Sequence, residues 1–278
     1  MAHKRLTTGF TLIELITVII VLGVVSVGIS GFIRTGVEIY SNVTERDQII
    51  GESRFLVERL NRELRSAIPN SVRVGTNSSE SIQCIEFVPA EWVSFYTSLS
   101  VHPDTSNSAT IVEFADNPVG FQLQPDDFAI VYPTSNADIY NLSNNKRKKI
   151  TACNDDDGDC GTLGDANRTA KLTLTGPFPD FSPASRLYVA RKLVSYCANS
   201  NGNIYRNQGG INPTMAFHSS GVLMAENMKN QLSEAEEAPF RVFDATLTRN
   251  SLVQILLSFE RNEEIINYLN EVHFPNVP

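Results

Sequence analysis

The sequence predicts an α+β protein in which one long amino-terminal helix packs on an antiparallel β-sheet domain. Three observations predict this fold class. An apolar run occupies residues 10–33, a helix-periodic apolar stripe continues to residue 68, and short β-rich segments separated by turns follow. These features divide the chain into residues 1–9, 10–33, 34–68 and 69–278.

The composition narrows the class of protein. The chain has 278 residues, of which 42% are hydrophobic and 19% charged, so it is not a disordered acidic chain. Its 23 Lys and Arg residues against 31 Asp and Glu residues give a net charge of −8. A general nucleic-acid-binding protein usually carries a basic face, so no nucleic-acid partner is expected.

The apolar run at 10–33 is long enough to cross a membrane. As a helix it would span roughly 36 Å, against about 30 Å for the hydrocarbon core of a bilayer. Lys4 and Arg5 precede it, and the next basic residue is Arg34. This asymmetry predicts a cytoplasmic amino terminus and a carboxy-terminal part on the other side of the membrane.

Glu14 is the only charge within the apolar run. A secretory signal peptide has a shorter apolar region, and neither a signal peptide nor a plain signal anchor explains an acid at membrane depth, which costs about 2.5–3.5 kcal/mol. Cleavage after Gly9 would supply a partner. The new α-amino group of Phe10 would lie four residues before Glu14 on the same helix face, or would reach the Glu14 of a neighbouring subunit.

The segment Gly9-Phe10-Thr11-Leu12-Ile13-Glu14, with its short basic leader and apolar run, resembles the processing site of type IV prepilins and type II secretion pseudopilins. The resemblance implies that a prepilin peptidase cuts between Gly9 and Phe10 and methylates the Phe10 amine. It also implies a pilin-like fold, in which the first half of the helix spans the membrane and mediates assembly. One departure is Gly31, at a position where major pilins commonly carry a helix-kinking proline.

Residues 34–68 are expected to continue the helix as its amphipathic half. The stripe recurs at three- and four-residue steps, and Pro69 ends the pattern. It consists of Ile49, Ser53, Leu56, Leu60, Leu64 and Ile68. A single helix of about 55–58 residues follows from this continuity, and its stripe requires a sheet to cover it.

The remainder of the chain is predicted to be β-rich. The expected strands are 82–88, 92–99, 110–115, 128–132, 171–175, 187–196, 240–246 and 252–259. Loops are expected at 103–108, 133–149 and 199–213, a short helix is an option at 221–232, and 263–272 is left open between helix and strand.

Three further stretches, 44–47, 54–65 and 271–278, resemble large minor pilins of the PilW and GspJ type, including those of the mannose-sensitive haemagglutinin (MSHA) pilus. The resemblance implies a non-enzymatic minor pilin that acts in pilus assembly, at the tip or in initiation. Its implied partners are major and minor pilins, the prepilin peptidase and the inner-membrane assembly platform. It also implies an inner-membrane protein with a periplasmic head that later joins a surface pilus. A minor pseudopilin of a type II secretion system is the alternative.

Four cysteines allow three disulfide connectivities. Cys153 and Cys160 are favoured as one pair because they flank a short Gly- and Asp-rich loop, which leaves Cys84 with Cys197 between two expected strands. An oxidising compartment beyond the membrane would permit both bonds. Cysteine and histidine spacing suited to zinc is absent from the sequence.

The loop between Cys153 and Cys160 contains Asp155, Asp157 and Asp159. Their spacing partly matches ligand positions 3, 5 and 7 of an EF-hand, but the bidentate acid at position 12 is replaced by Gly164. Two interpretations stay open: a calcium site, or a solvated acidic turn neutralised by the basic run 146–149. No other cofactor is expected.

The sequence carries no G-x-S-x-G, Walker A or H-E-x-x-H motif. Ser143 and Lys146 match S-x-x-K in an Asn-rich loop but lack its companion motifs. Because these motifs are absent, a non-enzymatic protein is expected. A membrane-tethered enzyme is the alternative from another functional class.

Overall fold

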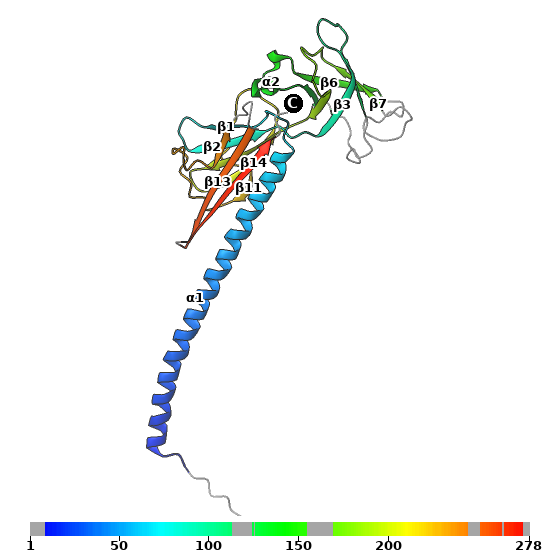
Figure 1. The fold of residues 1–278 in the computed structure, drawn as a ribbon. Helices are drawn as coiled ribbons and strands as arrows, with labels where there is room; N and C mark the ends of the chain where they lie inside the picture. Colours follow the sequence, from blue (N-terminus) through cyan, green and yellow to red (C-terminus); the bar gives the residue numbers. More distant parts are fainter. Residues whose placement is uncertain are drawn as a thin grey trace, which may run out of the picture. The chain divides into compact units, whose positions relative to one another are not determined.

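A computed structural model describes residues 9–112, 124, 126–154, 169–243, 251–262 and 264–274. The chain separates into two compact units, Met1–Gly51 and Glu52–Pro278. Helix α1, Leu12–Arg65, contributes to both units and is drawn as the long blue-to-cyan ribbon in Figure 1. Its 54 residues agree with the expectation of one long helix, which ends three residues earlier than predicted.

From Leu12 to Val43, α1 exposes its apolar side chains. By length and composition α1 could span a membrane, and no residue of its most apolar 18-residue window is buried. Serine and threonine hydroxyls along this part donate to carbonyls three or four residues earlier, as Thr17 does to Glu14 and Ser30 does to Ser26. The polar groups of these side chains are therefore satisfied within the helix itself.

The end of α1 that belongs to the second unit forms part of that unit's core. The predicted stripe is fully buried here: Ser53, Leu56, Leu60, Leu64 and Ile68 have no exposed surface. The Ser53 hydroxyl also donates to the Tyr268 hydroxyl at 3.0 Å, which joins the helix to the last strand. The sequence-based expectation of an antiparallel α+β architecture is confirmed at this level.

One sheet of the second unit has five strands. In spatial order they are β1 (Arg73–Thr76), β2 (Ile82–Phe87), β9 (Leu193–Asn199), β10 (Ile204–Gly209) and β11 (Val222–Ala225). All four pairings are antiparallel. Every residue of the central strand β9 is buried.

A second sheet has three antiparallel strands. These are β12 (Phe240–Phe243), β13 (Ser251–Arg261) and β14 (Glu264–Phe274), in that order. The long pair β13–β14 runs from Arg261↔Glu264 to Ser251↔Phe274. One face of β13 is buried at alternate residues, as expected for a half-covered sheet.

The remaining strands close into a six-stranded barrel. They are β3 (Trp92–Leu99), β4 (Ser108–Val112), β5 (Phe128–Val131), β6 (Arg147–Asn154), β7 (Thr169–Leu174) and β8 (Arg186–Ala190). The barrel lies in the sequence between β2 and β9, which are hydrogen-bonded neighbours in the five-stranded sheet. It is therefore an insertion between two adjacent strands.

The barrel and the five-stranded sheet share a hydrophobic cluster. Ile130 and Tyr188 from the barrel pack with Leu193 of β9, Ile68 and Ile211. Tyr140, from the short helix α2 (Asn136–Tyr140), closes the cluster and donates its hydroxyl to the Ser71 carbonyl at 2.6 Å. This buried contact attaches the barrel to the sheet through packing as well as through the chain.

Several predicted elements differ from the structure. The predicted strand 187–196 is two strands, β8 and β9, because the chain leaves the barrel and enters the sheet at Arg191 and Lys192. The optional helix at 221–232 is wrong: this segment begins with β11, and Gly221 has a φ of +148° that favours glycine. Of the open segment 263–272, residues 264–272 belong to β14, and residue 263 lies outside the described residues.

Two predicted loops also contain strands. The stretch 133–149 includes α2, a 3-10 turn (Leu142–Asn144) and the start of β6, whereas 199–213 contains β10. In both strands most residues are polar, which hides the alternation typical of a β-strand. The buried aliphatic residues that anchor β6 and β10 are Ile150 and Ile204. These segments form strands because they pair with well-buried neighbouring strands, and local composition does not reveal that pairing.

Candidate functional site

The predicted processing residues lie at the start of α1. Around Gly9 the space is open, because no described heavy atom comes within 4 Å of the place a Cβ would take. Phe10 is 80% exposed, and the helix begins two residues later. The Gly9–Phe10 bond therefore lies in an exposed segment before the helix. The leader residues 1–8 lie outside the described residues.

Glu14 occupies the first turn of α1. The backbone N–H groups of Glu14 and Leu15 both donate to the Thr11 carbonyl, at 3.1 and 3.2 Å. A carboxylate in this turn interacts favourably with the positive end of the helix dipole. Glu14 forms no ion pair with any described residue.

The other end of the helix carries a charged cluster that sequence reasoning missed. The Glu63 carboxylate accepts hydrogen bonds from Arg206 Nε at 3.0 Å, from Arg59 Nε at 3.0 Å and from the Tyr196 hydroxyl at 3.0 Å. Burial alone would raise the pKa of the Glu63 carboxyl, but these hydrogen bonds outweigh burial and lower the pKa below its ordinary value. Burial, with Glu63 nearby, raises the pKa of Tyr196.

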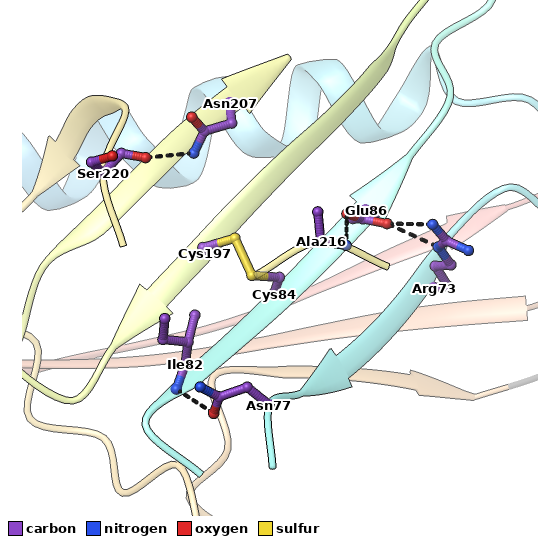
Figure 2. The surroundings of a disulfide bond; sticks show 9 residues. All are labelled: Arg73, Asn77, Ile82, Cys84, Glu86, Cys197, Asn207, Ala216 and Ser220. Carbon is purple, nitrogen blue, oxygen red and sulfur yellow. Dashed lines mark hydrogen bonds and ion pairs between the residues drawn. A yellow bond between two sulfur atoms is a disulfide. The ribbon is translucent and has the colours of Figure 1, made fainter. Parts of the chain in front are cut away.

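The predicted cysteine pair Cys84–Cys197 is present as a disulfide (Figure 2). The two residues are direct cross-strand partners on β2 and β9, with Cα atoms 4.1 Å apart. Since β2 leads into the inserted barrel and β9 leaves it, the bond lies at the base of the insertion. Cys160 lies outside the described residues, so the expected Cys153–Cys160 pair is not described.

A buried ion pair lies beside the disulfide (Figure 2). Glu86 is 1% exposed and accepts from Arg73 Nη2 at 2.7 Å and from the Ala216 N–H at 3.2 Å. The Arg73 guanidinium also lies 3.7 Å from the centre of the Tyr140 ring. Arg73 also donates to the carbonyls of Asn212 and Pro213, so this cluster joins β1 and β2 to the loop that contains Ala216.

The basic run 146–149 lies within the expected loop 133–149, but its residues 147–149 belong to β6. Lys146 pairs with Asp138 at 3.6 Å and Asp180 at 3.8 Å, and Lys149 pairs with Asp126 at 3.5 Å. Arg147 is buried, and its guanidinium lies 4.9 Å from the centre of the Phe128 ring. The S-x-x-K match at Ser143 and Lys146 thus places its lysine in an ion pair with Asp138.

The calcium hypothesis falls on Asp155, Asp157 and Asp159, which lie outside the described residues. Within the described part of the chain, no group of three His, Cys, Asp or Glu side chains is arranged to hold a metal ion. His102, His218 and His273 belong to separate parts of the second unit: the loop after β3, the segment before β11, and the end of β14.

A cleft of about 660 Å³ lies where the end of α1, the barrel and β14 meet. Its apolar lining consists of Ala67, Pro69, Ala90, Val93, Tyr188 and Val272. Its polar lining includes Arg65, Arg186, Glu271 and His273. These residues come from four distant parts of the sequence, which is why no motif could indicate the cleft.

Comparison of the chain with protein-family models, with curated proteins and with solved structures found no match. The functional argument therefore depends on the residues and geometry described above.

Proposed function

We propose that this chain is a minor subunit of a type IV pilus of the MSHA kind, cut after Gly9 and carried into the fibre by α1. The observation that carries the proposal is the arrangement at the start of α1. The exposed apolar stretch of α1 follows an accessible Gly9–Phe10 bond, with a single carboxylate in its first turn.

The exposed apolar surface needs a non-aqueous environment. A helix of a water-soluble core would be mostly buried, whereas the apolar window of α1 has no buried residue. A bilayer before assembly and the helices of other subunits after assembly would each cover it. The same helix would then serve as the membrane anchor and as the packing element of the fibre.

Glu14 gives this assembly a register. Cutting after Gly9 creates a cationic amine at Phe10, and methylation would keep that charge. In a low-dielectric helix bundle, a carboxylate requires such a partner. The Glu14 carboxylate of one subunit would pair with the Phe10 amine of its neighbour, and a helix shifted along the bundle would leave the acid unpaired.

The second unit provides the head. The buried stripe and the Glu63 cluster fix the end of α1 to the sheet, so a pull on the helix acts directly on the head. A head enlarged by an inserted barrel favours an initiating or tip position over a repeating one. The type II secretion alternative would use the same helix and the same processing residues.

Substitution of Gly9 tests the proposal. Gly9→Val adds a branched side chain at the scissile residue, and we expect the precursor to remain uncut in cells with a prepilin peptidase. Gly23→Val is the matched control, since its surroundings in the helix are equally open. Mass spectrometry of wild type and Gly23→Val should find a terminus at methylated Phe10. A Gly9→Val chain of mature mass would contradict the proposal.

A further inference from the structure

Strand β14 forms one edge of the three-stranded sheet, and no strand among the described residues pairs with its outer side. One of its N–H groups, that of Glu271, donates to the Asn270 side-chain oxygen at 3.0 Å. The strand is 11 residues long and contains no proline. On the face opposite Tyr268 and Val272, Leu269 is 65% exposed and Ile265 is 48% exposed. A long, unprotected edge of this kind is a template for pairing with another extended chain.

The same strand runs into the cleft. Glu271, Val272 and His273 at the end of β14 line it, together with the end of α1 and two barrel strands. Val93 and Tyr188 are cross-strand partners on β3 and β8, and they form an apolar floor. A chain that pairs with the edge of β14 would therefore be directed along this floor.

The rim of the cleft is cationic although the chain as a whole carries a net charge of −8. Arg65 and Arg186 line the cleft together with one acid, Glu271, which accepts from the Gln254 amide at 3.4 Å. The Arg65 guanidinium has no ion-pair partner among the residues that the structure describes. His273 adds a further hydrogen-bonding group.

We infer that the β14 edge and this cleft bind an extended acidic segment of another protein. The segment would add a strand to β14 through main-chain hydrogen bonds. It would place an aliphatic side chain on Val93 and Tyr188 and a carboxylate against Arg65 and His273. This site would accept such a segment whether or not the chain is a pilin.

A random heptapeptide display library, selected on the full-length chain in detergent micelles, tests the inference. We expect enriched peptides to alternate aliphatic and acidic residues. Binding of a labelled enriched peptide is then measured by fluorescence anisotropy. Because Arg65 would form a charge-assisted bond to the peptide, Arg65→Glu should weaken binding about tenfold or more. Arg62→Glu, on the same helix but outside the cleft, should change it less than about twofold.

Main-chain pairing is tested separately with the same peptide carrying N-methyl groups at alternate residues. Methylation removes the donors that strand addition needs, so binding should fall by about tenfold or more. Equal unfolding midpoints in urea for the Arg65→Glu and Arg62→Glu chains establish that both are folded.

Four results would overturn the inference. The first is no enrichment, or enrichment of basic peptides. The second is equal binding by the Arg65→Glu and Arg62→Glu chains. The third is undiminished binding of the methylated peptide. The fourth is a dimer in sedimentation that Arg65→Glu abolishes, because the cleft would then be occupied by a second copy of this chain.

Discussion

The Tyr196 hydroxyl on β9 donates a 3.0 Å hydrogen bond to the Glu63 carboxylate on α1. Arg206 of β10 reaches the same carboxylate, so two neighbouring strands hold one acid of the helix. Leu60 and Leu64, on either side of Glu63 in the sequence, are fully buried. The end of α1 is therefore fixed both by apolar packing and by a directional charged cluster.

Glu63→Gln should destabilise the second unit by about 1–3 kcal/mol, because it leaves Arg206 and Arg59 without a carboxylate in a mostly buried position. Urea unfolding of the full-length chain in detergent, followed by fluorescence of the single Trp92, measures this loss. Glu58→Gln is the control, since Glu58 and its partner Arg54 are largely exposed, and it should cost less than about 0.5 kcal/mol. Equal losses of unfolding free energy for the two variants would contradict a stabilising role of the Glu63 cluster.

The stability of the second unit should depend on pH through two acids. Burial works against the charged forms of Glu63 and Asp138, but hydrogen bonds and nearby cations lower the pKa of each below its ordinary value, 4.5 for Glu63 and 3.8 for Asp138. A lowered folded-state pKa contributes stability that is present above the ordinary pKa and is lost as pH falls through the folded value. The urea midpoint should therefore be stable near neutrality and fall below about pH 4.5. Glu63→Gln should reduce the fall of the urea midpoint at low pH. An unchanged fall in this variant would show that the Glu63 carboxyl does not cause it.

The helix and its buried stripe could be predicted from the sequence because both follow from periodicity and from the absence of proline before Pro69. The barrel could not be predicted. Its closure joins β3 to β8 across a long stretch of sequence. In another barrel strand, β6, Arg147 and Lys148 mask the strand pattern. The cleft was missed for the same reason, since Arg65 and His273 meet only through the tertiary fold.

Removal of the Cys84–Cys197 disulfide should destabilise the base of the barrel insertion. The bond spans 113 residues of sequence, and loss of such a crosslink typically costs about 2–4 kcal/mol. Either Cys84→Ala or Cys197→Ala breaks the bond, so the double variant should lose little more than each single variant in urea unfolding. Additive losses, or none, would show that the bond does not stabilise the fold.

Glu14→Val should leave membrane insertion intact and weaken recruitment into the fibre. The substitution removes a charge that is costly at membrane depth, so fractionation should still place the chain in the membrane. It also removes the proposed partner of the Phe10 amine, so the chain should be depleted from sheared pili by immunoblot. Glu38→Val, farther along the same exposed helix, is the matched control. Normal incorporation of the Glu14→Val chain would contradict the pairing role.

The subunit should cap or prime the fibre and not form its repeating body. A repeating subunit stacks at every position, so each interface must accommodate its head, and here a six-stranded barrel is inserted between β2 and β9 of that head. At the tip the head needs a neighbour only below it, and Glu14 receives the amine of that one neighbour. An epitope placed in the exposed turn at 233–237 should label fibre ends in immunoelectron microscopy, and deletion of the gene should sharply reduce surface pili. The same epitope on the major subunit is the control for access along the shaft. Uniform shaft labelling at the abundance of the major subunit would overturn the tip assignment, because the head would then fit every interface of the lattice.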